Sequence, residues 1–216
     1  MRDHCHSKTH HGETTRGHVI HWAPLYEGVF GRLLRRTHGA VVDLAASSTG
    51  ERVLDVGCGT GSLAVALKGA VGPTGSVLGI DASPEMIDVA RRNASKAGVA
   101  VDFQVGLGEA IPLANGTFDL VVSQLAIHHF PDDLKPSAFG EMYRLLKPGG
   151  RCLIVDFEPP KSVLGRLVAW IVLGRVMMRI NVADYRTLLE NAGFTRVETG
   201  QTGHRLLSYI RGHVAK

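Results

Sequence analysis

The chain has 216 residues and a mass of 23.2 kDa, with 44% hydrophobic and 20% charged residues. This length fits one domain of ordinary size, and the composition excludes global disorder because such a chain can bury a real core. Its three cysteines, Cys5, Cys58 and Cys152, are odd in number and widely spaced. Together with the lack of a signal peptide, they argue against a disulfide scaffold and predict a cytoplasmic location.

Charge is distributed unevenly along the chain, whose formal net charge is +4. Residues 41–160 carry nine basic and fourteen acidic side chains, whereas residues 161–216 carry nine basic and three acidic ones. Residues 1–40, with six basic and three acidic side chains, are also basic. Basic flanks are typical of contact with an anionic partner, such as a phosphorylated or carboxylated substrate, a membrane surface or nucleic acid. They are equally compatible with solvated termini.

The first 18 residues have no apolar period, so we expect residues 1–18 to form a mobile, histidine-rich arm. His4, Cys5 and His6 lie together there, but a structural zinc site needs a second ligand pair, so we predict no metal site. Residues 21–46 carry apolar side chains at helical spacing and predict a helix that caps the domain. Residues 19–216 are then expected to form a single domain.

From Gly50 onward, short β-rich runs alternate with helical runs. Pro84 at a first helical position and Gly98 beyond a last one mark the ends of one helix. Repeated strand–helix units predict an α/β fold, a doubly wound and mostly parallel sheet with helices on both faces. The expected strands are 52–56, 76–81, 101–106, 118–123, 151–157, 195–200 and 205–211. The expected helices are 62–70, 85–98, about 133–147, 162–179 and 184–192.

The strongest functional signal is VLDVGCGTG at 53–61, where an apolar strand runs into a glycine-rich turn. Glycines allow the backbone to approach a ligand closely, and the start of the next helix offers unpaired N–H groups. The spacing is G-x-G-x-G, and Ser62 stands where a dinucleotide fingerprint has its third glycine. Asp55, just before the turn, suits an ammonium or sulfonium group better than a pyrophosphate. The sequence therefore predicts a ligand with a cationic reactive end.

An acidic residue follows at the end of the second strand. Asp81 lies 20 residues after Gly61, where an acidic side chain commonly holds two ribose hydroxyls. Asp81 could instead cap the next helix, but Ser83 already fills that position. We therefore predict that Asp81 binds a ribose.

Five motifs in this order resemble those of the class I S-adenosylmethionine-dependent methyltransferases: VLDVGCGTG, VGPTGSVLGIDASPEMI, GEAIPLANGTFDLVVS, LAIHHF and LLKPGGRCLIVDF. The resemblance covers roughly residues 20–212 and is strongest to the group of ubiquinone/menaquinone C-methyltransferases and other small-molecule enzymes. It implies a Rossmann-like sheet of seven strands, with an antiparallel strand supplied by the C-terminal hairpin. It also implies S-adenosylmethionine as the cofactor and a small molecule as the methyl acceptor.

The resemblance also assigns cofactor contacts by position. Asp55 and the glycines at 57, 59 and 61 would surround the methionine end, and Asp81 would hold the ribose. Leu107 stands where relatives often have an acidic residue for the adenine amino group, so backbone groups and apolar contacts are expected to hold the adenine. The full expected set is Asp55, Gly57, Cys58, Gly59, Gly61, Asp81, Ala82, Met86, Leu107, Gly108 and Gln124.

Catalytic candidates follow the strand at 118–123, at the carboxyl edge where α/β folds bind ligands. A hydroxyl or carbon acid needs a base near neutral pH, and either His128 or His129 could supply it. Only one can point inward; we slightly favour His129, and either could merely pack or cap. Asp156 could pair with His128, contact a substrate amine or cap the following segment. Tyr26 could close the site.

Residues 161–180 have four basic side chains and an uncharged run of at most eight residues, too short to span a bilayer. We expect an apolar cap over the pocket, although this segment could also contact a membrane surface. No [D/N]PP motif follows the fourth strand and aromatic residues make up 6%, so nucleic acid is disfavoured. We predict a methyltransferase for a small apolar or amphipathic acceptor. Phospholipid or prenyl-quinone methylation at a membrane, or a non-catalytic cofactor-binding scaffold, are the alternatives.

Overall fold

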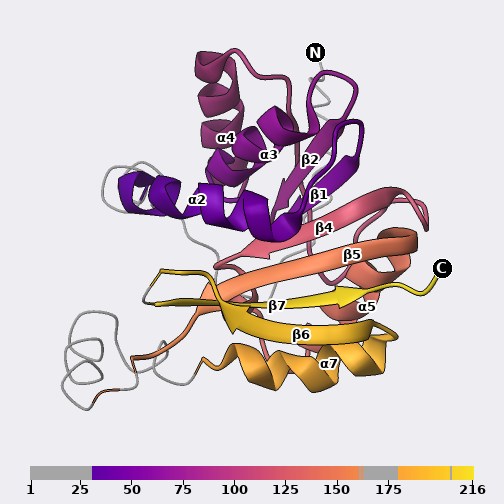
Figure 1. The fold of residues 1–216 in the computed structure, drawn as a ribbon. Coiled ribbons are helices and arrows are strands. Elements are labelled where there is room, and N and C mark those ends of the chain that lie inside the picture. The colour runs from indigo at the N-terminus through magenta and orange to yellow at the C-terminus, as the bar shows by residue number, and fades with distance from the viewer. Residues whose placement is uncertain (1–30, 161, 163–179, 205) are drawn as a thin grey trace, which may run out of the picture.

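The computed structural model describes residues 31–160, 162, 180–204 and 206–216 (Figure 1). The expected arm at 1–18, Tyr26 and the first part of the helix at 21–46 lie outside these residues. So does the expected cap at 161–180, except for Ser162 and Ile180.

Seven strands form one sheet in the order β3-β2-β1-β4-β5-β7-β6. The pairs from β3 to β5 are parallel, whereas β7 is antiparallel to both β5 and β6. The predicted doubly wound sheet with an antiparallel strand from the C-terminal hairpin is therefore confirmed. The strands are β1 Arg52–Val56, β2 Ser76–Asp81, β3 Asp102–Val105, β4 Phe118–Gln124, β5 Leu146–Phe157, β6 Thr195–Gln201 and β7 Leu207–His213.

Helices cover both faces of the sheet, as predicted (Figure 1). One face packs against α2, α3 and α4, and the other packs against α5 and α7. Successive strand residues such as Val53 and Leu54 are both fully buried, one in each core, as expected for a parallel sheet covered on both sides. The helices are α2 Gly31–Ala45, α3 Ser62–Val71, α4 Pro84–Ala97, α5 Lys135–Leu145 and α7 Tyr185–Ala192, with short 3₁₀ turns η1 Ile127–His129 and η2 Val182–Asp184.

Local sequence signals placed most element ends within two residues. Ser83 caps α4 by accepting a hydrogen bond from the Met86 N–H, and Gly98 ends this helix with a left-handed φ of 66°. The exception is β5, which begins at Leu146 rather than at the predicted residue 151. Its register against β4 shifts between Phe118 and Leu120, so a bulge carries the glycine-containing stretch 147–150 into the strand.

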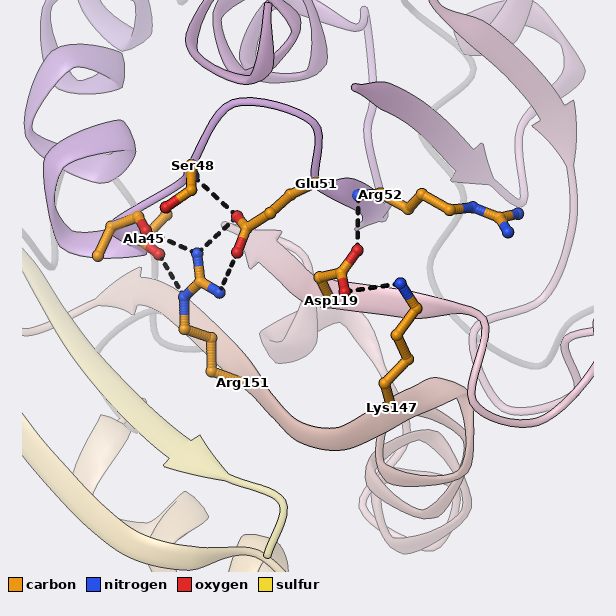
Figure 2. A network of polar contacts seen from close by, with 8 residues as sticks. Ala45, Ser48, Glu51, Arg52, Asp119, Lys147 and Arg151 are labelled. Carbon is orange, nitrogen blue, oxygen red and sulfur yellow. Dashed lines mark hydrogen bonds and ion pairs between the residues drawn. The ribbon is translucent and has the colours of Figure 1, made fainter. Parts of the chain in front are cut away.

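Polar contacts join the amino ends of β1, β4 and β5 to the end of α2 (Figure 2). Arg151 of β5 binds both carboxylate oxygens of Glu51 at 2.8 Å and donates to the carbonyls of Ala45 and Ala46 at 2.7 Å. Beside this pair, Lys147 bonds to Asp119 at 2.7 Å. Because the last carbonyls of a helix lack partners of their own, these contacts fix the C-terminal end of α2 to the sheet. We call this set of contacts the amino-edge clamp.

Candidate active site at the carboxyl ends of the strands

The glycine-rich turn between β1 and α3 has a backbone that only glycine adopts readily. Gly57, Gly59 and Gly61 all have left-handed φ angles, of 73°, 52° and 77°. A Cβ atom on Gly57 would lie 2.3 Å from the Cβ of Ala126, whereas one on Gly59 would meet nothing within 4 Å. The turn is therefore packed tightly at its first glycine and leaves open space at its second, where a ligand could approach the backbone.

Asp55 lies directly beneath this turn. The residue is 1% exposed, and its Oδ2 atom is buried without a hydrogen-bond partner. Burial, together with the negative charge of Asp81, raises the pKa of Asp55 to about 7. A buried carboxylate without a partner is costly, so a cation bound here would satisfy it. This agrees with the cationic ligand that the sequence predicts.

Asp81 connects the glycine-rich turn to α4. Its Oδ2 atom accepts a hydrogen bond from the Gly59 N–H, and its Oδ1 atom accepts one from the Ser83 N–H, both at 2.9 Å. Burial raises the pKa of Asp81, although these two hydrogen bonds act in the opposite direction. Ser83 is the N-cap of α4, so capping does not account for Asp81. Beyond it, Ala82 is half-buried and Met86 is buried.

The loop after β3 carries the expected adenine contacts. Leu107 forms an antiparallel bridge with Ala110, and Gly108 is buried. Arg144 of α5 donates hydrogen bonds to the carbonyls of Ile111 at 2.8 Å and of Leu113 at 2.7 Å, and these bonds fix the loop to α5. Sequence reasoning missed Arg144 because its partners lie 31 and 33 residues away.

The end of β4 meets α2 at the same edge. Gln124 donates a hydrogen bond through Nε2 to Thr37 Oγ1 at 2.8 Å. The next residue, Leu125, has a left-handed φ of 54°, which is uncommon for a side chain of this kind. This backbone conformation redirects the chain from β4 into the turn that carries His128 and His129.

His128 is held by a buried carboxylate. Its Nδ1 atom lies 2.6 Å from Asp156 Oδ1, and its backbone N–H donates to Asp156 Oδ2 at 3.1 Å. Tyr185 of α7 also donates its hydroxyl to Asp156 Oδ2, at 3.1 Å. The side chains of His128 and Asp156 are 5% and 0% exposed. As whole residues, His128 and His129 are both half-buried. Of the alternatives for Asp156, the pairing with His128 is the one found. Tyr185 was not foreseen, because nothing local links it to β5.

Two of the three cysteines lie in the described part of the chain. Cys58 and Cys152 are buried, unpaired thiols whose pKa values are raised by burial, that of Cys152 to about 12. Among the described residues, no three His, Cys, Asp or Glu side chains form a group that could hold a metal ion. No helix within these residues is long and apolar enough to cross a membrane.

This sheet order, the reversed β7, the glycine-rich turn after β1 and the acidic end of β2 are the features that the resemblance to class I methyltransferases implies. Comparison with known proteins agrees. Residues 53–150 match the family described as "Methyltransferase domain". The chain is 38% identical over 180 residues to a demethylmenaquinone methyltransferase from Thermus thermophilus, covering 78% of this chain and 80% of that one. It is 32% identical over 159 residues to a 2-phytyl-1,4-naphtoquinone methyltransferase from Synechococcus elongatus, covering 71% and 67%.

Among solved structures, a SAM-dependent methyltransferase from Aquifex aeolicus shares the fold, with a TM-score of 0.70 at 23% identity, covering 82% of this chain and 89% of that one. The chain therefore belongs to the S-adenosylmethionine-dependent methyltransferases, in the group that resembles the ubiquinone and menaquinone C-methyltransferases. The unpartnered oxygen of Asp55 and the open space at Gly59 fit this cofactor, whose methionine end carries a sulfonium and an ammonium group.

Proposed function

We propose that this methyltransferase acts on a small apolar or amphipathic acceptor, specifically a hydroxylated aromatic ring of the naphthoquinol type. Two relatives whose names specify naphthoquinone-type acceptors support this choice. A ring of this kind gives up a proton during methylation at carbon or oxygen, so the enzyme must supply a base. The pairing of His128 with Asp156 at 2.6 Å is the observation that carries the proposal.

The cofactor residues follow from the geometry of the carboxyl edge. S-adenosylmethionine supplies an electrophilic methyl group on a positively charged sulfur. We assign Asp55 to the cationic methionine end, since its buried Oδ2 atom has no partner. Asp81, whose oxygens are aimed at the turn and at the start of α4, is assigned to the ribose. Met86, Leu107 and Gly108 are assigned to the adenine.

His128 is the base in this proposal. Asp156 is fully buried and accepts from Nδ1 of His128, so the proton of the neutral imidazole resides on Nδ1 and the lone pair on Nε2. A buried carboxylate also stabilises the imidazolium that forms when the base takes up a proton. The sequence alone slightly favoured His129, whose ring centroid lies 4.0 Å from that of His128. We therefore reverse the preference between the two histidines.

Turnover of a reduced naphthoquinol with single substitutions tests the proposal. His128→Ala should lower kcat by about 100-fold, the usual contribution of a positioned base, while calorimetry gives an unchanged affinity for S-adenosylmethionine. Asp156→Asn should lower kcat less and shift its pH profile, because the imidazolium loses its carboxylate. His129→Ala is the matched control.

Each contrary outcome points to a different part of the proposal. A larger loss in His129→Ala than in His128→Ala would return the base to His129. Methylation of other small acceptors but of no naphthoquinol would refute the acceptor class. Tight cofactor binding without turnover on any acceptor would favour a non-catalytic scaffold.

A further inference from the structure

The turn that carries both histidines is packed between the two loops assigned to the cofactor. At its start, Ala126 presses on Gly57 of the glycine-rich turn, where an added Cβ would come within 2.3 Å of the Ala126 Cβ. At its end, Phe130 presses on Gly108 of the loop after β3. A Cβ on Gly108 would lie 2.7 Å from Phe130 Cζ, 3.0 Å from Phe130 Cε1 and 3.1 Å from Val56 Cγ1.

Gly108 is a glycine for reasons of space rather than backbone conformation. It is absent from the described glycines with positive φ, unlike Gly57. The Cζ and Cε1 atoms of the Phe130 ring occupy the space that a side chain at position 108 would need. Packed interiors transmit small displacements because they have few voids, so a shift of the loop at Gly108 must move Phe130.

Two backbone hydrogen bonds and one buried side chain hold the turn together. The His129 N–H donates to the Ala126 carbonyl at 3.0 Å, and the Phe130 N–H donates to the Ile127 carbonyl at 3.1 Å. Ile127 is 1% exposed and packs in the core beneath the sheet. A displacement of Phe130 therefore reaches His129 and His128, which are one and two residues earlier in the chain.

We propose that Phe130 is a positioning residue that couples the adenine loop around Gly108 to His128 and His129. Cofactor binding fixes this loop, and the contact between Phe130 and Gly108 then sets the position of the base. The inference rests on the proposed function, because it takes the histidine turn as catalytic and Gly108 as part of the cofactor site.

A double-substitution cycle in the full chain tests the coupling. Gly108→Ala should weaken S-adenosylmethionine binding and lower kcat, each by about tenfold, since the new Cβ meets the Phe130 ring. Phe130→Ala should lower kcat by itself. Gly108→Ala combined with Phe130→Ala should bind the cofactor at least threefold more tightly than Gly108→Ala alone, because the ring that clashes is gone.

Gly106→Ala in the same loop is the matched control, since its Cβ would come no closer than 3.8 Å to any neighbour, Ile80 Cβ. Melting temperatures check that each variant folds. If Gly108→Ala does not fold, Phe130→Leu provides a milder change at the same contact. The coupling would be overturned if the losses in cofactor affinity of the two single variants simply multiplied in the double variant. It would also be overturned if Gly108→Ala were as active as Gly106→Ala. Cofactor affinity is measured without turnover, so it tests the contact between Phe130 and Gly108 separately from the proposed base. If binding is non-additive but His128→Ala and His129→Ala both remain active, the proposed base is refuted and the contact is not.

Discussion

The two ends of the strands in the central sheet differ in whether their carboxylates are paired with cations. At the amino edge, Glu51 and Asp119 are each bound by a cationic side chain (Figure 2). Burial alone would raise their pKa values, but hydrogen bonds from Arg151 and Lys147 and the nearby positive charges hold both below the usual range. At the carboxyl edge, Asp55 is buried without a partner and has a pKa raised to about 7.

Left-handed backbone occurs at both edges. At the carboxyl edge it is adopted by the three glycines of one turn and by Leu125, and in the amino-edge clamp by Ala46, whose carbonyl accepts a hydrogen bond from Arg151. The pairing of charge therefore separates the two edges: paired charges at one edge contribute stability, and an unpaired carboxylate at the other is kept in place for a ligand. Substitutions at the two edges should therefore change different quantities.

Removing the carboxylate of Asp81 should have the largest effect on cofactor affinity. Asp81→Ala deletes an acceptor that fixes Gly59 and Ser83 and that we assign to the ribose. We expect a loss of about 3 kcal/mol, roughly 100-fold in Kd, from hydrogen bonds to a charged group. Calorimetric titration with S-adenosylmethionine and S-adenosylhomocysteine measures it. An unchanged Kd in a folded variant would refute the ribose assignment.

Asp55 should make cofactor binding depend on pH. In the free protein its pKa of about 7 means that Asp55 is protonated at lower pH, whereas a cation binds its carboxylate. Binding therefore releases a proton, so affinity should rise with pH from about 5 to 7, approaching tenfold per unit, and level off above pH 7. Calorimetric titrations in buffers of different ionisation enthalpy measure the number of protons released when the cofactor binds.

Asp55→Asn should bind the cofactor about tenfold more weakly at pH 8 and lose this pH dependence. 5′-Methylthioadenosine, which lacks the methionine end, serves as the control ligand and should show no such dependence in either protein. A wild-type affinity that stays constant between pH 5 and 8 would contradict the role of Asp55.

Substitutions in the amino-edge clamp should change stability with no effect on cofactor affinity. Arg151→Ala breaks the pair with Glu51 and leaves the last carbonyls of α2 without donors, so we expect a loss of about 2–3 kcal/mol. Denaturant unfolding measures it. Lys147→Ala, whose pair with Asp119 is more exposed, should cost less than about 1 kcal/mol. A weaker Kd for S-adenosylmethionine in Arg151→Ala, with the fold intact, would show that the two edges are not independent.

Features encoded by neighbouring residues could be predicted. Ser83, Pro84 and Gly98 marked the ends of α4 because caps depend on a few adjacent backbone groups. The glycine-rich turn was recognisable because left-handed φ angles strongly favour glycine. The early start of β5 was missed, since a bulge depends on how Leu146 pairs with Phe118 of another strand.

The site divides in the same way. By itself, the sequence determined the order of strands and helices and predicted a ligand with a cationic end, because each depends on local pattern. The resemblance of its motifs to those of known methyltransferases implied the cofactor class. Only the tertiary structure decided that Asp156 and Tyr185 hold His128, that Thr37 meets Gln124 and that Phe130 rests on Gly108. These partners lie 22 to 87 residues apart in the chain. Their contacts arise from how the sheet brings distant segments together, which no local propensity specifies.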